Sequence, residues 1–144
     1  MSRLNRFARL PLAEKILFIE AFFFVVVIRT ALWLIPFKVF QSGFRKFLAA
    51  KAETAEPDWI QLKNIVRSVK FASRFVPFAS CLTQALSALV IVKLKGQQAE
   101  LKIGVAKNAE SNFEAHAWLE KDGQILIGKL PEHGRFMVLN FNQG

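Results

Sequence analysis

Residues 113–127 read FEAHAWLEKDGQILI, and this stretch decides the fold of the C-terminal part of the chain. Apolar residues alternate in it with polar or amphipathic ones, which is the period of two typical of a half-buried β-strand. The two sets are Phe113, Ala115, Ala117 and Leu119 on one face and Glu114, His116, Trp118 and Glu120 on the other. Lys121–Gly123 predicts a three-residue hairpin loop with glycine where φ is positive. Residues 125–127 then return as the next strand.

The regions on either side of this hairpin predict the rest of the fold. Residues 101–105 also alternate and are expected to form a strand, and residues 136–141 are expected to add a fourth. Further upstream the apolar period changes to that of a helix. Helices are expected over residues 16–35 and 40–48, from Pro57 to about residue 70, and from Ser80 to Gly96. Helices first and an antiparallel sheet last predict an α+β chain.

Length and composition narrow the classes of protein that remain. The chain has 144 residues, which predicts a single domain over 1–144 with a helical N-terminal part at 1–75. A hydrophobic content of 53% excludes intrinsic disorder. One cysteine excludes a disulfide framework and a Cys-rich zinc site, and two histidines leave little for a metal. We therefore expect neither a metal nor a cofactor.

The chain is strongly basic, with 20 Lys and Arg against 11 Asp and Glu and a net charge of +9. Such a charge favours anionic partners. Nucleic acid is not expected, because the sequence has no winged-helix signature, no zinc-finger spacing and no basic stripe interleaved with exposed aromatics. Its 15 Phe and absence of Tyr suit a core or a lipid-facing surface better than a platform for stacking bases.

Residues 16–35 form the most apolar segment and are long enough to span a bilayer. Glu20 and Arg29 interrupt the segment, and an arginine near the middle of a span costs roughly 2.5–3.5 kcal/mol. A buried or membrane-surface helix is therefore favoured over a span. We expect a cytoplasmic protein in which this helix is either buried or lies peripherally at the inner face of the membrane.

Cys81 and His116 are the candidate catalytic residues. Ser80 is expected to cap the fourth helix, which makes Cys81 its first residue. A helix N-terminus favours the thiolate by about 0.3–1 kcal/mol, so a strong nucleophile needs a second contribution, which a nearby imidazolium can supply. In such a pair the thiolate attacks a carbonyl carbon, the imidazolium protonates the leaving amine, and backbone N–H groups at the helix start hold the oxyanion.

A structural interpretation of the same residues stands beside the catalytic one. A single cysteine in an apolar helix is usually a small buried hydrophobe, and a histidine in a strand is usually a surface residue. Trp118 is expected to serve packing, His133 to be solvated in a Pro/Gly loop, and Gln84 to face either the site or solvent. Spacing alone does not decide between the two interpretations.

Three segments, in order and with matching gaps, resemble the leader peptidases of lasso-peptide biosynthesis, transglutaminase-like relatives of the microcin-processing proteins. They are residues 80–86 (SCLTQAL), 101–107 (LKIGVAK) and 113–123 (FEAHAWLEKDG). The similarity runs from about Leu12 to Leu130 and includes the apolar N-terminal helices that end in LIPF at residues 34–37.

The resemblance implies a papain-like or transglutaminase-like catalytic core at residues 76–144, in which the helix that bears Cys81 packs on the antiparallel sheet. Cys81 would be the nucleophile and His116 the base of a cytosolic cysteine protease. This protease would cut the leader peptide from a ribosomally made precursor in bacteria. The implied partners are the precursor leader peptide, a separate leader-recognition protein and an ATP-dependent lasso cyclase that closes the macrolactam.

Two departures from the family pattern bear on catalysis. Many members carry an Asp twelve residues after the histidine, where this chain has Gly128, and no Gln for a papain-style oxyanion hole precedes Cys81. Two other functions therefore remain open. One is a non-catalytic, membrane-associated maturation scaffold, and the other is an acyltransferase that uses the same thioester with an amine acceptor.

The expected hairpin register bears on the third catalytic residue. It pairs Glu120 with Gln124 and so places Gly128 opposite His116. Gly128→Asp is then expected to keep or raise activity. Asp122, six residues from His116, would lie about 20 Å away along the strand and is excluded. The remaining candidates are Glu114, Asn140 and Asn142.

Overall fold

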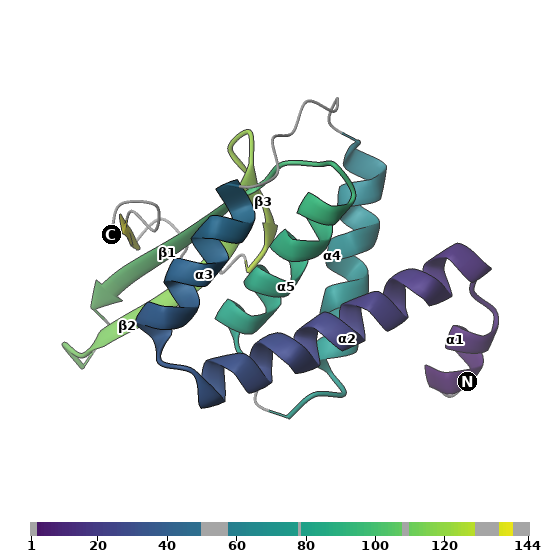
Figure 1. Ribbon diagram of the computed structural model, residues 1–144, viewed down its shortest axis with the longest axis horizontal. Coiled ribbons are helices and arrows are strands. Elements are labelled where there is room, and N and C mark those ends of the chain that lie inside the picture. The colour runs from purple at the N-terminus through teal and green to yellow at the C-terminus, as the bar shows by residue number, and fades with distance from the viewer. Residues whose placement is uncertain (1–2, 50–57, 78, 108–109, 129–135, 140–144) are drawn as a thin grey trace.

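The computed structural model describes residues 3–49, 58–77, 79–107, 110–128 and 136–139. Five helices precede four strands along the chain (Figure 1). They are α1 (Arg3–Ala8), α2 (Leu12–Leu34), α3 (Phe37–Ala49), α4 (Trp59–Ser73), α5 (Cys81–Leu94), β1 (Glu100–Lys107), β2 (Phe113–Lys121), β3 (Gln124–Ile127) and β4 (Met137–Leu139). The predicted α+β class is confirmed, and α1 is an element that the sequence analysis did not anticipate.

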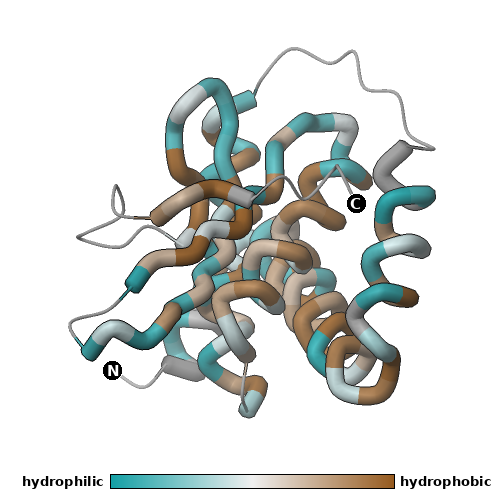
Figure 2. The backbone as a smooth tube through the Cα atoms, turned by 90° about the vertical axis from the view of Figure 1, so that its left-hand side faces the viewer, coloured by the Kyte–Doolittle hydropathy of each residue, from teal (hydrophilic) through white to brown (hydrophobic). Residues whose placement is uncertain are grey.

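Helix α5 is the central element of the fold. It packs against α2 and α4 on one side and against β1 and β2 on the other. Every residue from Ala85 to Val92 is buried, so this part of the helix has no solvent face. A helix that is apolar on all sides is stable when its neighbours surround it, and here helices and sheet do so. Figure 2 shows that the chain in the centre of the molecule consists largely of hydrophobic residues.

The ends of α5 are fixed by local hydrogen bonds. At its start the Ser80 side chain accepts a hydrogen bond from the Thr83 N–H at 3.3 Å, which confirms the predicted N-cap. At its end Gly96 has φ +76°, and the N–H of Gln97 donates to the carbonyl of Val92 at 2.9 Å. This is the glycine-terminated end that the sequence predicted.

The start of α4 differs from the prediction. Asp58 is the N-cap, and its side chain accepts from the N–H of Gln61 at 3.0 Å, so the helix begins at Trp59. Aspartate is a strong N-cap because its carboxylate satisfies an N–H that the helix itself leaves unpaired. Pro57, which was expected to be the first helical residue, lies outside the described residues, as does the connection at 52–56.

The four strands form one sheet in the order β3-β2-β1-β4, and each neighbouring pair is antiparallel. β1 and β2 pair without interruption from Glu100↔Glu120 to Lys107↔Phe113, which places Gly104 opposite His116. The fourth strand is described over Met137–Leu139, and residues 140–141 of the predicted strand lie outside the described part.

The β2–β3 hairpin corrects the predicted register. Lys121 pairs with Gln124 and Glu120 with Ile125, so the loop has two residues and not three. Asp122 (φ +49°) and Gly123 (φ +80°) both adopt the left-handed conformation that a two-residue turn of this kind requires. A bulge between Leu119 and Glu120 then shifts the register again, so that Leu119 pairs with Ile127.

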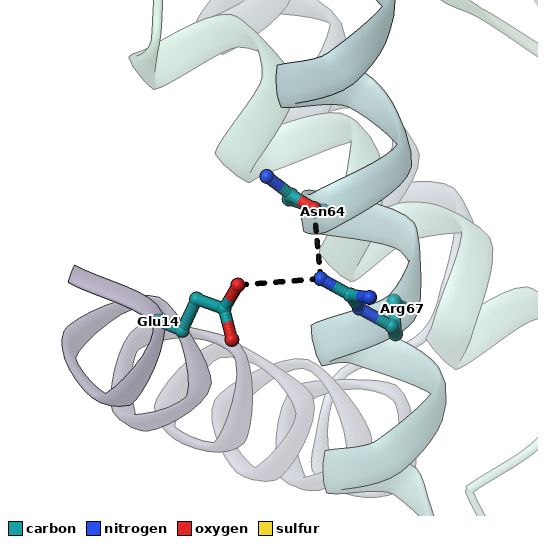
Figure 3. A network of polar contacts seen from close by, with 3 residues as sticks. All are labelled: Glu14, Asn64 and Arg67. Carbon is teal, nitrogen blue, oxygen red and sulfur yellow. Dashed lines mark hydrogen bonds and ion pairs between the residues drawn. The ribbon is translucent and has the colours of Figure 1, made fainter. Parts of the chain in front are cut away.

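Helix α2 crosses the helical layer and packs against α4 and α5. Ala21, Val25 and Ile28 lie on its inner side and are at most 5% exposed. Two ion pairs add to this contact, from Glu14 to Arg67 at 3.5 Å (Figure 3) and from Glu20 to Lys95 at 3.4 Å. By length and composition alone, α2 could also cross a membrane.

Candidate active site

Cys81 is the first residue of α5, as predicted. Its side chain is half-buried and packs against the main apolar core. The next N–H groups are not equivalent. Those of Thr83 and Gln84 donate to the side chain and carbonyl of Ser80, whereas within the described residues those of Cys81 and Leu82 donate to no protein acceptor. These two N–H groups are therefore the donors available to an oxyanion beside the sulfur.

His116 lies in β2 and is half-buried. Its ring stacks on Trp118 with a centroid distance of 6.1 Å and lies 5.7 Å from the Phe136 ring. Trp118 is only 2% exposed and donates its indole N–H to Glu120 at 2.7 Å, so it serves packing, as expected. The two rings fix the plane of the imidazole.

The imidazole Nε2 of His116 lies 2.5 Å from the carbonyl oxygen of Gly128. A carbonyl oxygen can only accept a hydrogen bond, so Nε2 carries the proton. In the neutral ring Nδ1 is then unprotonated and able to take a proton from a nucleophile. This arrangement sets the tautomer that a general base requires, and the group that sets it belongs to the main chain.

Gly128 could not be replaced by a larger residue without a shift in the structure. Its φ is +93°, which side chains other than glycine's rarely adopt. An added Cβ would lie 2.8 Å from the carbonyl oxygen of Ala117 and 2.9 Å from the Cβ of Trp118. This corrects the expectation for Gly128→Asp: an aspartate here is strained and displaces β2, so the substitution should lower activity.

Gly104 faces the same side of the sheet as His116 and makes room for the aromatic residues there. A Cβ at this position would lie 2.8 Å from two ring atoms of Trp118 and 2.9 Å from the Cβ of Phe136. The tryptophan ring therefore lies against the backbone of β1. The sequence analysis did not single out Gly104 or Phe136, although an isolated glycine inside an alternating strand is typical of such a close approach.

The structure places Cys81 and His116 in different side-chain clusters. Cys81 packs with the core between α5 and the sheet, to which Ala117 and Leu119 of β2 contribute. His116 alternates with those residues and lies beside the second cluster, formed by Ala106, Trp118 and Phe136. Figure 1 shows α5 beginning near the end of the sheet where β1 ends and β2 begins. In the described part of the chain no hydrogen bond joins the Cys81 thiol to the His116 imidazole, and their pairing stays a prediction.

The other candidates are distributed as follows. Asp122 lies exposed in the turn at the far end of β2, away from His116. Glu114 is half-buried, two residues before His116 on β2, and Gln84 is half-buried on the first turn of α5. His133, Asn140 and Asn142 lie outside the described residues. In the described ranges, no group of three or more His, Cys, Asp or Glu side chains could hold a metal ion.

A basic cavity of about 540 Å³ lies between α4 and β3. Its cationic wall consists of Lys63, Arg67, Lys70 and Arg74, which recur along one side of α4. The opposite wall is Gln124, Ile125 and Leu126 of β3, two residues before Gly128. Neither Cys81 nor His116 lines the cavity, so it is separate from the candidate site.

Comparisons with known proteins agree with this architecture. Residues 31–140, which include α5 and the whole of the described sheet, match the transglutaminase-like superfamily. No curated protein and no solved structure matches. The match covers more than half of the chain. The chain therefore belongs to the transglutaminase-like superfamily.

Proposed function

We propose that the chain is a cysteine peptidase that removes the leader peptide from a lasso-peptide precursor. Cysteine-protease or acyl-transfer chemistry is common in the superfamily, and the resemblance at residues 80–86, 101–107 and 113–123 narrows this to leader removal. The observation that carries the proposal is the contact between His116 Nε2 and the Gly128 carbonyl. It leaves Nδ1 as the basic nitrogen, and surface histidines have no need of such a fixed tautomer.

The proposed reaction has two steps. The Cys81 thiolate attacks the carbonyl carbon of the scissile peptide bond, the C–N bond breaks, and the His116 imidazolium gives its proton to the leaving amine. Water then attacks the thioester with His116 as base, which releases the leader carboxylate and restores the thiol. The N–H groups of Cys81 and Leu82 would hold the oxyanion in both steps. Because His116 alternates along β2 with residues that pack with Cys81, the reaction requires a rearrangement that brings thiol and imidazole together when substrate binds.

The basic cavity between α4 and β3 would hold an acidic segment of the precursor. Its four cations attract carboxylates, and β3 is an edge strand along which an extended peptide can lie. β3 leads directly to Gly128, whose carbonyl contacts His116. A peptide that follows this strand would therefore approach the candidate site.

The proposal includes two further proteins. Residues 1–75 are expected to provide no winged-helix module, so leader recognition would fall to a separate small protein. An ATP-dependent cyclase would consume the freed core peptide. Calorimetry tests the first point: nanomolar binding of a leader peptide by this chain alone would contradict the need for a recognition protein.

Product analysis tests the function itself. Purified protein is mixed with a lasso-peptide precursor and a separate leader-recognition protein, both chosen from the genes that neighbour its own, and products are identified by mass spectrometry. Leader peptidase activity yields a leader with a free carboxylate and a core with a free amine. Transfer to an added primary amine instead of water would indicate the acyltransferase. A lack of both products, together with unchanged binding of the precursor, would indicate the scaffold.

A further inference from the structure

The outer side of α2 is as apolar as its inner side. Its exposed residues include Leu12, Ile16, Ile19, Phe23, Val26, Val27, Trp33 and Leu34, which are between 38% and 74% exposed. They recur at helical spacing opposite Ala21, Val25 and Ile28, and we call them the outer stripe. At 1.5 Å per residue the stripe is about 32 Å long. An ordinary surface helix is polar on this side.

The outer stripe offers almost no polar group to a partner. Thr30 is its one hydroxyl residue, and its Oγ1 donates to the carbonyl of Val26 at 2.8 Å within the helix. The indole N–H of Trp33 is the one polar side-chain group among the residues that define the stripe. Interfaces between proteins carry about one hydrogen bond per 100–200 Å², so a long surface with a single such donor is poorly suited to a specific protein partner. The hydrocarbon core of a membrane, in contrast, forms no hydrogen bonds and needs no donors on the surface that it covers.

The charges around α2 favour an anionic surface. Residues 3–49 contain eight Lys and Arg and two acidic residues, Glu14 and Glu20. Both glutamates form ion pairs with the layer behind α2, to Arg67 and Lys95. The flanking helices α1 and α3, which adjoin the two ends of α2 (Figure 1), carry basic residues and no acidic ones.

The inner contacts of α2 determine how it can meet a membrane. Its inner side is buried against α4 and α5, and the charged side of α4, with Lys63, Arg67 and Lys70, cannot follow it into hydrocarbon. The helix can therefore enter lipid from one side only. Trp33, 74% exposed near its C-terminal end, is the residue type that prefers the boundary between headgroups and acyl chains.

From these observations we propose that the outer stripe docks the protein on an anionic phospholipid membrane, with α2 lying in the plane of the interface. The buried apolar side chains supply hydrophobic binding, and the basic residues at both ends of α2 attract the headgroups. The proposal does not depend on the peptidase function.

Vesicle sedimentation tests the proposal. The full chain is mixed with vesicles of phosphatidylcholine alone or of phosphatidylcholine and phosphatidylglycerol in equal parts. We expect binding to the anionic vesicles, weaker binding to the neutral ones, and weakening by salt. Ile19→Glu/Phe23→Glu should reduce binding roughly tenfold or more, since two apolar side chains that would insert into the membrane are lost. Both positions are already exposed, at 61% and 58%, so folding should be unaffected.

The matched control is Met137→Glu/Val138→Glu, which adds the same two charges at apolar residues of β4 that are 72% and 50% exposed. It should bind vesicles as wild type does. Absence of wild-type binding, or equal binding by the Ile19→Glu/Phe23→Glu variant, would overturn the proposal. A wild-type dimer in solution that this variant dissolves, without vesicle binding, would assign the stripe to a second copy. Cellular protein that resists both carbonate and high-salt extraction would indicate a span.

Discussion

Helices α2 and α5 are the two most apolar helices described, yet they occupy opposite kinds of environment. α5 is enclosed by α2, α4 and the sheet and has no solvent face between Ala85 and Val92. α2 buries one side and exposes an equally apolar second side. Composition therefore does not distinguish a core helix from a surface-bound one. The neighbours of each helix decide, and these depend on the topology of the whole chain.

The largest expected effect concerns the one position where α5 carries chemistry. Cys81→Ala should reduce leader cleavage by at least about 10⁴-fold, because no other thiol exists in the chain to form the thioester. The cap at Ser80 remains, so helix content and the unfolding midpoint should not change. Rates are followed by mass spectrometry and folding by circular dichroism. Cleavage at the wild-type rate would show that α5 carries no catalytic group.

The second prediction tests the burial difference directly. Leu86→Ala, at a fully buried position of α5, should lower the free energy of unfolding by about 2–5 kcal/mol, through lost burial and the cavity left behind. Ile19→Ala, at a 61% exposed position of α2, should change it by less than about 0.5 kcal/mol. Urea unfolding measures both. Equal losses would mean that the outer stripe is covered in solution.

A third prediction compares Gly128, where an added Cβ would clash with its neighbours, with Gly43, where it would not. Gly128→Ala should cost about 1–3 kcal/mol and slow cleavage, because its φ of +93° and the nearby Ala117 oxygen oppose a Cβ. Gly43→Ala in α3, where an added Cβ meets nothing within 4 Å, should be neutral or stabilise by up to about 1 kcal/mol. Thermal unfolding and cleavage assays give both comparisons. A Gly128→Ala variant as active and stable as wild type would show that the strand accommodates a Cβ here and that the predicted displacement is wrong.

The smallest expected effect concerns the ion pair that links α2 to α4. The Arg67 side chain is 68% exposed, so Arg67→Met should change the free energy of unfolding by less than about 0.5 kcal/mol. Val25→Ala, at a fully buried position of α2, should cost about 1.5–3 kcal/mol. Urea unfolding distinguishes the two. If Arg67→Met were the more damaging, charge and not burial would hold α2 in place.

The elements of the fold were largely predictable, because periodicity is a local property. The alternation in residues 113–120 predicted β2, and Ser80 and Gly96 correctly predicted the two ends of α5. The register of the hairpin was predicted wrongly. The Asp122-Gly123 pair is typical of a two-residue turn, so this error was avoidable, whereas the bulge at Leu119 leaves no comparable trace in the sequence.

The candidate site was less predictable than the fold. Cys81 and His116 could be named because side chains with that chemistry are rare in this chain. The sequence offers only side chains as candidates for the third catalytic group, namely Asp122, Glu114 and two asparagines. The acceptor for His116, the main-chain carbonyl of Gly128, cannot be identified from the sequence. Every residue has such a carbonyl, and only the three-dimensional structure shows which one contacts the imidazole. The placement of Cys81 and His116 in different side-chain clusters likewise depends on how the helices pack on the sheet, which their spacing in the sequence does not reveal.

The contact between His116 and the Gly128 carbonyl also determines how this interaction responds to mutation and to pH. No codon change can delete a main-chain oxygen, so this acceptor persists through any mutation that preserves the strand path. An aspartate in the same role would lose its charge as the pH falls through about 3.9, whereas an amide oxygen keeps its accepting lone pairs in acid and base alike. A chain that orients its histidine in this way gives up the extra stabilisation of a carboxylate. In return it has an acceptor that does not titrate, and a substitution can affect it only by moving the strand that carries it.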